Sequence, residues 1–217
     1  SQFWDGRVES LHEQALMPIF NPKEMGLSIE ESIDRLNKSQ YKDKFEAIFS
    51  GAITKDSLAE VISEFIKTLI TPNSRFDKYL QGDKTLLSEQ EIRGYETFQN
   101  IGCISCHNGV NMGGNMYQKI GIMIPYDHAE NDTSYEGRFK VTHRLRDRAV
   151  FKVPTLRNIE LTAPYLHDGS ALTLKEVVID MREHQLGILD EDESIDALVA
   201  FLKTLTGDKP NIMKENK

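Results

Sequence analysis

The sequence predicts a mostly α-helical protein, on three observations. Apolar residues recur at helical spacing through the segment 54–69 and mark one buried stripe: Leu58, Val61, Ile62, Phe65, Ile66 and Leu69. Three capping boxes, each pairing a hydroxyl residue with a glutamate three positions later, mark helix starts: Ser28 with Glu31, Ser88 with Glu91, and Thr173 with Glu176. No alternating strand pattern of useful length stands out.

The elements follow in order along the chain. The segment 71–74, Thr-Pro-Asn-Ser, interrupts the helical pattern and is the best candidate for a domain boundary. The segment from about 108 to 154 is rich in Gly, Asn and other polar residues, and we expect a long loop that wraps around something. The segment 193–205 predicts a last amphipathic helix, whose inner face carries Ile195, Leu198, Val199, Leu202 and Leu205.

Composition limits the function classes. The 217 residues are 39% hydrophobic and 28% charged, which is ordinary for a globular protein of one large domain or two small ones. The formal net charge of −8 excludes nucleic acid as an expected partner, because phosphate backbones attract basic proteins. A partner redox protein with a basic patch is compatible with this charge. No run of about 18 apolar residues occurs, so no membrane-spanning helix is expected.

Both cysteines lie in one motif, Cys103-Ile104-Ser105-Cys106-His107. This is the C-x-x-C-H pattern of covalent c-type haem attachment, in which two thiols reach the two vinyl groups of one porphyrin and the histidine lies under the iron. A zinc site would need further good ligands, and no other cysteine is available. A redox dithiol would want a βαβ context, whereas a helical segment precedes this motif. We therefore predict one haem c on Cys103 and Cys106, with His107 as an axial ligand, in electron transfer or peroxide chemistry.

The sixth iron ligand is less determined by the residues themselves. The methionines are Met17, Met25, Met112, Met116, Met123, Met181 and Met213. Met112 and Met116 follow the motif so closely that the chain would have to turn sharply around the haem edge. Met181 ends a helical segment far enough along to reach the opposite face, although a methionine in an amphipathic helix is more often core filler. Ligation of the iron by histidine and methionine would suit an electron carrier, and an open sixth position would suit a haem that reacts with a substrate.

Several long motifs in order resemble the bacterial di-haem cytochrome c peroxidases and their MauG relatives, from Phe3 to about Gly187. The resemblance is strongest in Phe-Lys-Val-Pro-Thr-Leu-Arg-Asn at 151–158, followed by Leu-Thr-Ala-Pro-Tyr at 161–165. It is also carried by the haem motif and by the segments 3–7, 13–15, 21–25, 75–80 and 113–114.

The resemblance implies a cytochrome c-like haem domain plus part of a second, N-terminal haem domain. Residues 1–72 would be the remainder of the N-terminal peroxidatic-haem domain, and residues 73–217 the C-terminal electron-transfer domain. The motif at Cys103 matches the second, high-potential haem of the family, and Met181 matches that haem's axial methionine. MauG has a tyrosine there, so Met181 favours the peroxidase branch.

The family's distal peroxide pocket implies roles for three further residues. Glu24 would move a proton between the oxygens of bound peroxide, Gln14 would orient the peroxide by hydrogen bonding, and Trp4 would relay electrons between the two haems. Without the resemblance, these residues would be read as a solvated helical Glu, a helix-surface Gln and a buried Trp anchor.

Other matched positions imply a cation and a histidine near the haem. The backbone carbonyls of Thr162 and Pro164 match positions that hold calcium in the family, and carbonyl oxygens suit that hard cation. His167 matches a histidine near the electron-transfer haem and the domain interface. An ordinary hydrogen-bonded histidine is its alternative reading.

One departure from the family pattern matters, because its first haem motif would precede Phe3. A second haem is therefore expected on a missing N-terminal segment or on another chain. Two explanations remain open: a portion of a longer peroxidase, or a natural one-haem protein. Ser1 follows no leader, and since haem c is normally attached after export, we expect a processed or truncated start.

The resemblance implies a periplasmic peroxidase that reduces hydrogen peroxide to water. Electrons from a small donor such as a cytochrome c or a cupredoxin would enter at the haem held by His107 and Met181, and the protein would be a homodimer. The alternative is a single-haem electron-transfer cytochrome without catalysis. A third interpretation is a structural haem subunit of a larger redox complex.

Overall fold

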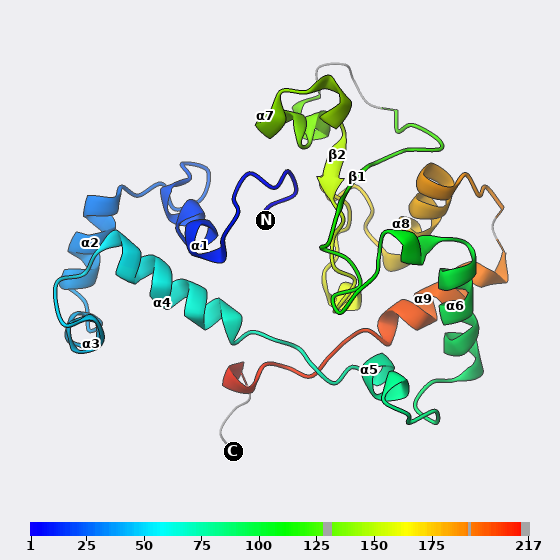
Figure 1. Ribbon diagram of the computed structural model, residues 1–217, viewed down its shortest axis with the longest axis horizontal. Coiled ribbons are helices and arrows are strands. Elements are labelled where there is room, and N and C mark those ends of the chain that lie inside the picture. Colours follow the sequence, from blue (N-terminus) through cyan, green and yellow to red (C-terminus); the bar gives the residue numbers. More distant parts are fainter. Residues whose placement is uncertain (128–131, 191, 214–217) are drawn as a thin grey trace. The chain divides into compact units, whose positions relative to one another are not determined.

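The computed structural model describes residues 1–127, 132–190 and 192–213, and it divides into two compact units (Figure 1). The first unit comprises residues 1–3, 7–70 and the described residues from Pro210 onward. The second comprises residues 4–6 and, within 71–209, those that are described. Part of the predicted long loop, residues 128–131, lies outside the described residues. The change of unit after Ile70 falls close to the break in helical pattern at 71–74, while the assignment of haem domains to the two parts stays a prediction.

The first unit is built from helices. They are α1 (Leu11–Phe20), α2 (Ile29–Asn37), α3 (Lys42–Phe49) and α4 (Lys55–Lys67), with a short 3₁₀ turn at Asn211–Met213. Helix α1 begins at a capping box in which the Ser10 hydroxyl accepts the Glu13 N–H. Helices α1 and α4 contact each other, and their apolar faces form a core that includes Leu16, Ile19 and Leu58.

The predicted helix over 54–69 is confirmed as α4, but its predicted buried stripe is partly wrong. Leu58 is buried and Ile62 is half-buried, whereas Val61 and Phe65 are 38% and 49% exposed. The buried face is rotated toward Ala59, which is fully buried. A small residue at this position allows a close approach to the neighbouring helix, so the larger apolar side chains lie at the edge of the contact.

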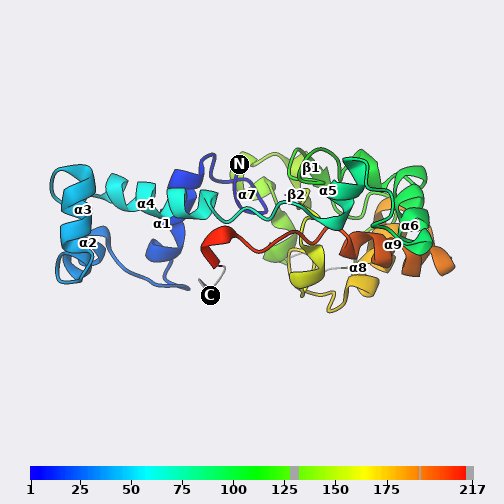
Figure 2. The same ribbon diagram turned by 90° about the horizontal axis from the view of Figure 1, so that it is seen from below.

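The second unit contains helices of different lengths packed around an aromatic core. They are α5 (Arg75–Leu80), α6 (Glu89–Asn100), α7 (Phe139–Thr142), α8 (Leu174–Asp180) and α9 (Glu193–Lys203). Helices α6 and α9 lie side by side in both views (Figures 1 and 2). Phe201 is fully buried, with its ring 5.1 Å from Phe76 and 5.3 Å from Phe98. At the crossing, a Cβ on Gly94 would lie 1.9 Å from the carbonyl oxygen of Ala197, so only glycine permits this approach.

The predicted helix starts are mostly confirmed. Ser88 and Thr173 form full capping boxes, with reciprocal hydrogen bonds to Glu91 and Glu176. At Ser28 the hydroxyl accepts the Glu31 N–H, but the Glu31 carboxylate pairs with Arg35 at 2.6 Å instead of closing the box. The last predicted helix is confirmed as α9, with its Ile195, Leu198 and Leu202 side chains buried.

The structure contains two short strands, although no strand pattern of useful length stands out in the sequence. Strands β1 (Tyr117–Lys119) and β2 (Val150–Lys152) pair antiparallel, with Gln118 opposite Phe151. Both lie within the predicted loop region, which also holds α7 and 3₁₀ turns at Thr133–Glu136 and Leu145–Asp147. Strands of three residues are too short to show alternation in sequence. The mostly α class is nevertheless confirmed.

Among the described residues, no helix has both the length and the apolar character needed to cross a bilayer.

Candidate functional site

The C-x-x-C-H motif forms a single tight turn at the end of α6. Gly102 adopts φ 105°, a left-handed conformation suited to glycine, and the chain enters a 3₁₀ turn at Cys103–Ser105. The carbonyl oxygen of Cys103 accepts the N–H of Cys106 at 3.3 Å and that of His107 at 3.0 Å. The two cysteines do not form a disulfide with each other. This turn, which we call the attachment turn (103–107), presents two thiols and one imidazole from five consecutive residues.

The two thiols lie in a half-buried environment. Burial raises the pKa of the Cys103 thiol to about 11, while the positive charge of Arg182 acts in the opposite direction. The Gln118 side-chain amide donates a weak hydrogen bond to the Cys106 sulfur at 3.9 Å. A thiol with a raised pKa is a poor nucleophile at neutral pH. The surroundings of Cys103 therefore disfavour the redox-dithiol interpretation.

The His107 ring is suited to binding a metal. Burial lowers the pKa of His107, and interactions with the backbone of Met112 and Pro154 oppose this shift. Its Nδ1 atom is buried and has no hydrogen-bond partner among the described residues. A neutral imidazole is the form that ligates metals, and a metal-bound histidine commonly directs its other nitrogen to a backbone carbonyl. An iron bound by a neutral His107 ring would fit this environment.

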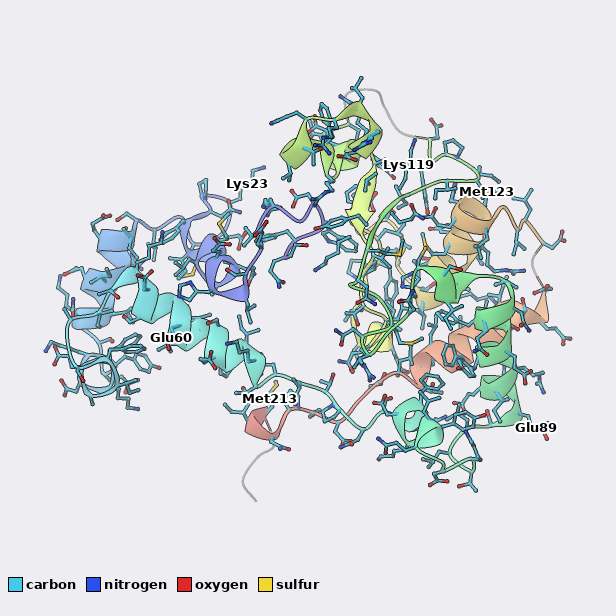
Figure 3. All side chains as sticks on the ribbon, viewed as in Figure 1. Lys23, Glu60, Glu89, Lys119, Met123 and Met213 are labelled. Carbon is cyan, nitrogen blue, oxygen red and sulfur yellow. The ribbon has the colours of Figure 1, made fainter. Side chains whose placement is uncertain are left out.

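Met181 lies at a change in helix geometry. Helix α8 ends at Asp180, and Met181–Gln185 form a π-helical turn in which Met181 is half-buried. Such turns are frequent at functional sites. Met112 is part of the core, and Met123 is 59% exposed beside this turn, where its N–H donates to the His184 carbonyl at 3.0 Å (Figure 3). These two methionines are less suited to ligation, and Met181 as the sixth ligand stays a prediction.

The segment after Met181 lies against the attachment turn. The Leu186 Cδ2 atom is 3.8 Å from the position that a Cβ on Gly102 would take. Cys103 packs against the same buried cluster to which Val178 of α8 belongs. The structure therefore brings the predicted attachment residues and the predicted axial-ligand segment together within one unit. These groups fit a covalently held haem: two thiols and a half-buried imidazole in one turn, with the half-buried Met181 on the segment that precedes Leu186.

The predicted distal residues Gln14 and Glu24 both lie in the first unit. Gln14 is half-buried on α1, and Glu24 is exposed in the following turn, where its carboxylate accepts the Asn21 amide at 2.7 Å. The N–H of Met25 donates to the carbonyl of Pro18 at 3.1 Å and folds this turn back on α1. Glu24 is therefore an exposed residue of a turn, whereas the alternative interpretation placed it in a helix.

Trp4 belongs to the second unit, together with the attachment turn. Its carbonyl accepts the Lys152 N–H at 2.8 Å, which fixes it beside β2. The Trp4 side chain is 40% exposed, so the reading as a buried anchor is wrong. Its role as an electron relay, like the roles of Gln14 and Glu24, stays a prediction.

The predicted calcium positions and His167 lie after β2. Thr162 and Pro164 are exposed, and the described residues contain no cluster of three or more His, Cys, Asp or Glu side chains that could hold a metal ion. Calcium on backbone carbonyls stays a prediction. The His167 ring stacks on Phe151 at 4.2 Å and meets Tyr135 edge-on at 4.8 Å. Both His167 nitrogens are buried without a hydrogen-bond partner among the described residues, which contradicts the ordinary hydrogen-bonded reading.

Sequence reasoning missed Arg182. This residue is only 5% exposed, directly after Met181. Arg182 lies four residues after the buried Val178 and therefore on the same face of the helical segment. A charged residue on such a buried face is unusual, and this was the signal available in the sequence.

The chain is similar to a known protein family and to several named proteins. A family model described as di-haem cytochrome c peroxidase matches residues 1–85. The chain is 48% identical to a cytochrome c551 peroxidase of Nitrosomonas europaea, over 97% of this chain and 63% of that protein. It is 38% identical to the cytochrome c551 peroxidase of Pseudomonas aeruginosa, over 98% of this chain and 62% of that protein. The chain thus spans less than two thirds of these relatives.

Solved structures share the fold. A MauG-like protein associated with microbial copper homeostasis superposes with a TM-score of 0.79 at 29% identity, over 94% of this chain and 73% of that one. The di-haem peroxidase BthA of Burkholderia thailandensis gives a TM-score of 0.72 at 20% identity, over 100% of this chain and 68% of that one. The second likeness supports the fold alone.

Proposed function

Because the chain belongs to the di-haem cytochrome c peroxidase and MauG family, we propose that it is the electron-transfer part of an enzyme that reduces hydrogen peroxide to water. One observation carries the proposal. The attachment turn presents Cys103, Cys106 and a half-buried His107 together, in a chain related over nearly its full length to cytochrome c551 peroxidases.

Four residues would hold the cofactor. Cys103 and Cys106 would bind haem c covalently, and His107 and Met181 would be its axial ligands. Haem c supplies one-electron transfer when it is bound. A thioether ligand such as Met181 favours a high reduction potential, which suits a site that receives electrons and passes them on.

Three residues would serve the reaction with peroxide. Each hydrogen peroxide takes up two electrons and two protons and gives two water molecules. Glu24 would carry a proton from one peroxide oxygen to the other, which is typically worth about 10²–10⁴ in rate. Gln14 would orient the peroxide by a hydrogen bond, and Trp4 would lie on the electron route. The haem at which peroxide reacts would be held by another segment or another chain.

The proposed setting follows from the family. The enzyme would work in the periplasm as a homodimer, with a small cytochrome c or cupredoxin as donor. Calcium would be held through the carbonyls of Thr162 and Pro164. The net charge of −8 would favour a donor that presents a basic patch.

A second candidate is a single-haem electron carrier, because the attachment turn by itself would hold one haem c. Peroxide consumption by the natively purified, haem-loaded protein with a reduced cytochrome c separates the two. The peroxidase proposal predicts turnover that Glu24→Gln reduces while the haem spectrum stays unchanged. Absence of turnover in a preparation that carries both haems would contradict the peroxidase proposal, and a natively purified protein with a single haem and no turnover would favour the carrier.

A further inference from the structure

Arg182 is a buried cation next to the proposed haem site. Its side chain is 6% exposed, and it lies at the second position of the π-helical turn, directly after Met181. The Nε atom is buried and has no hydrogen-bond partner among the described residues. A guanidinium in such a place loses hydration without full compensation, which costs free energy.

The charge of Arg182 is only partly balanced. Its Nη2 atom is 3.5 Å from a carboxylate oxygen of Asp192, whose side chain is 55% exposed. That same oxygen also accepts the Ser194 N–H at 2.9 Å, because Asp192 caps α9. An exposed carboxylate is screened by water, so it offsets a buried cation incompletely. A net positive field therefore remains on the buried side of the turn.

This field reaches the attachment turn. The charge of Arg182 stabilises the thiolate of Cys103 against the effect of burial. Leu186, one helical turn further on, lies beside Gly102 at 3.8 Å. The segment that carries Arg182 thus lies against the residue that precedes the attachment turn, and the charge of the guanidinium acts on Cys103.

We propose that Arg182 sets the reduction potential of the haem attached at Cys103 and Cys106, an inference that rests on the proposed haem c function. When the haem is reduced, one electron from the donor enters the buried site, and no bond forms or breaks. A nearby cation in surroundings of low dielectric constant stabilises the added negative charge. Arg182 therefore raises the potential and favours acceptance of electrons at this site.

The test is a redox titration of the haem-loaded protein, followed by visible absorption, for Arg182→Gln and Arg182→Lys. We expect Arg182→Gln to lower the ratio of reduced to oxidised haem at a fixed potential about tenfold, equivalent to about 59 mV for one electron. Arg182→Lys keeps the charge and should stay within about threefold of the parent. A glutamine variant with an unchanged ratio and an unchanged spectrum would overturn the inference.

Asp192→Asn is a matched variant on the opposing charge. Asparagine can still cap α9, so the fold is expected to persist, while the field of Arg182 becomes less balanced. The ratio of reduced to oxidised haem should rise, and a fall would contradict the inference. This variant and Arg182→Lys keep the test decisive if Arg182→Gln does not fold. Loss of covalent haem from the unmodified protein would instead refute the proposed function itself.

Discussion

Arg157 holds the carboxylate of Asp77 with two parallel hydrogen bonds, from Nη1 to Oδ2 at 2.9 Å and from Nη2 to Oδ1 at 2.7 Å. Its Nε atom donates to the Val110 carbonyl at 2.6 Å. Asp77 also accepts the Ser74 N–H at 3.0 Å and caps α5. One guanidinium thus links α5, the loop after the attachment turn and the Phe-Lys-Val-Pro-Thr-Leu-Arg-Asn segment.

Replacing Asp77 by asparagine should lower the free energy of unfolding by about 2 kcal/mol, because hydrogen bonds to charged groups are strong and both side chains are largely shielded from water. Urea unfolding at neutral pH measures this. The matched control is Asp34→Asn, which breaks an exposed ion pair with Lys38 and should change stability by less than about 1 kcal/mol. Equal losses of stability in Asp77→Asn and Asp34→Asn would contradict a strong interaction between Asp77 and Arg157.

The same pair should make stability depend on pH. Hydrogen bonding from Arg157 holds the pKa of Asp77 below its ordinary value, and Ser74 contributes. A depressed carboxyl pKa stabilises the fold above the pKa of the unfolded state, about 3.9, and this contribution is lost as pH falls through the lower, folded-state value. The stability difference between the parent and Asp77→Asn should therefore shrink between neutral pH and about pH 3. A difference that stays constant would refute the mechanism.

Gly94→Ala should destabilise the second unit by at least about 1–3 kcal/mol, since the added Cβ would lie 1.9 Å from a backbone oxygen and force α6 and α9 apart. Thermal unfolding of the haem-loaded protein measures the loss. Gly51→Ala is the control, because a Cβ there has no atom within 4 Å. An alanine at position 94 that leaves the melting temperature unchanged would contradict the close helix crossing.

Met181→Ala should remove the sixth iron ligand and lower the reduction potential of the haem, with a changed visible spectrum. Covalent attachment should persist, because the thiols are untouched. The control is Met123→Leu, an exposed methionine beside the same π-helical turn, which should leave spectrum and potential as they are. If Met123→Leu alters the spectrum and Met181→Ala does not, the ligand assignment is wrong.

Glu24→Gln should lower peroxide turnover in the complete enzyme by about 10²–10⁴, because glutamine cannot shuttle the proton. The measurement is the steady-state rate with reduced donor, alongside the haem spectrum, which should not change. Glu60→Gln, an exposed glutamate on α4 that Figure 3 labels, should retain the parent rate. Similar rates for both variants would remove Glu24 from the catalytic role.

Local signals in the sequence predict local structure well. The hydroxyls of Ser88 and Thr173 satisfy backbone N–H groups within one turn, so those helix starts could be read directly. The C-x-x-C-H motif likewise occupies one turn, in which the N–H groups of Cys106 and His107 donate to the Cys103 carbonyl. These features depend on neighbours within a few residues.

Features that depend on tertiary packing could not be predicted. Phe65 has helical spacing but lies at the edge of the α1–α4 contact, where it is 49% exposed. Strand β1 finds its partner β2 more than 30 residues away, and each strand is too short to carry a pattern. Helix α8 packs against α9, and the π-helical turn and the buried Arg182 that follow α8 belong to this tertiary setting, which no single segment encodes.

The most direct test of the account is the intact mass of the natively purified protein under denaturing conditions. We expect a polypeptide that retains haem covalently on the attachment turn. The double variant Cys103→Ser, Cys106→Ser should lose this covalent haem. A parent protein whose mass is that of the bare polypeptide, with haem released on denaturation or absent, would contradict it.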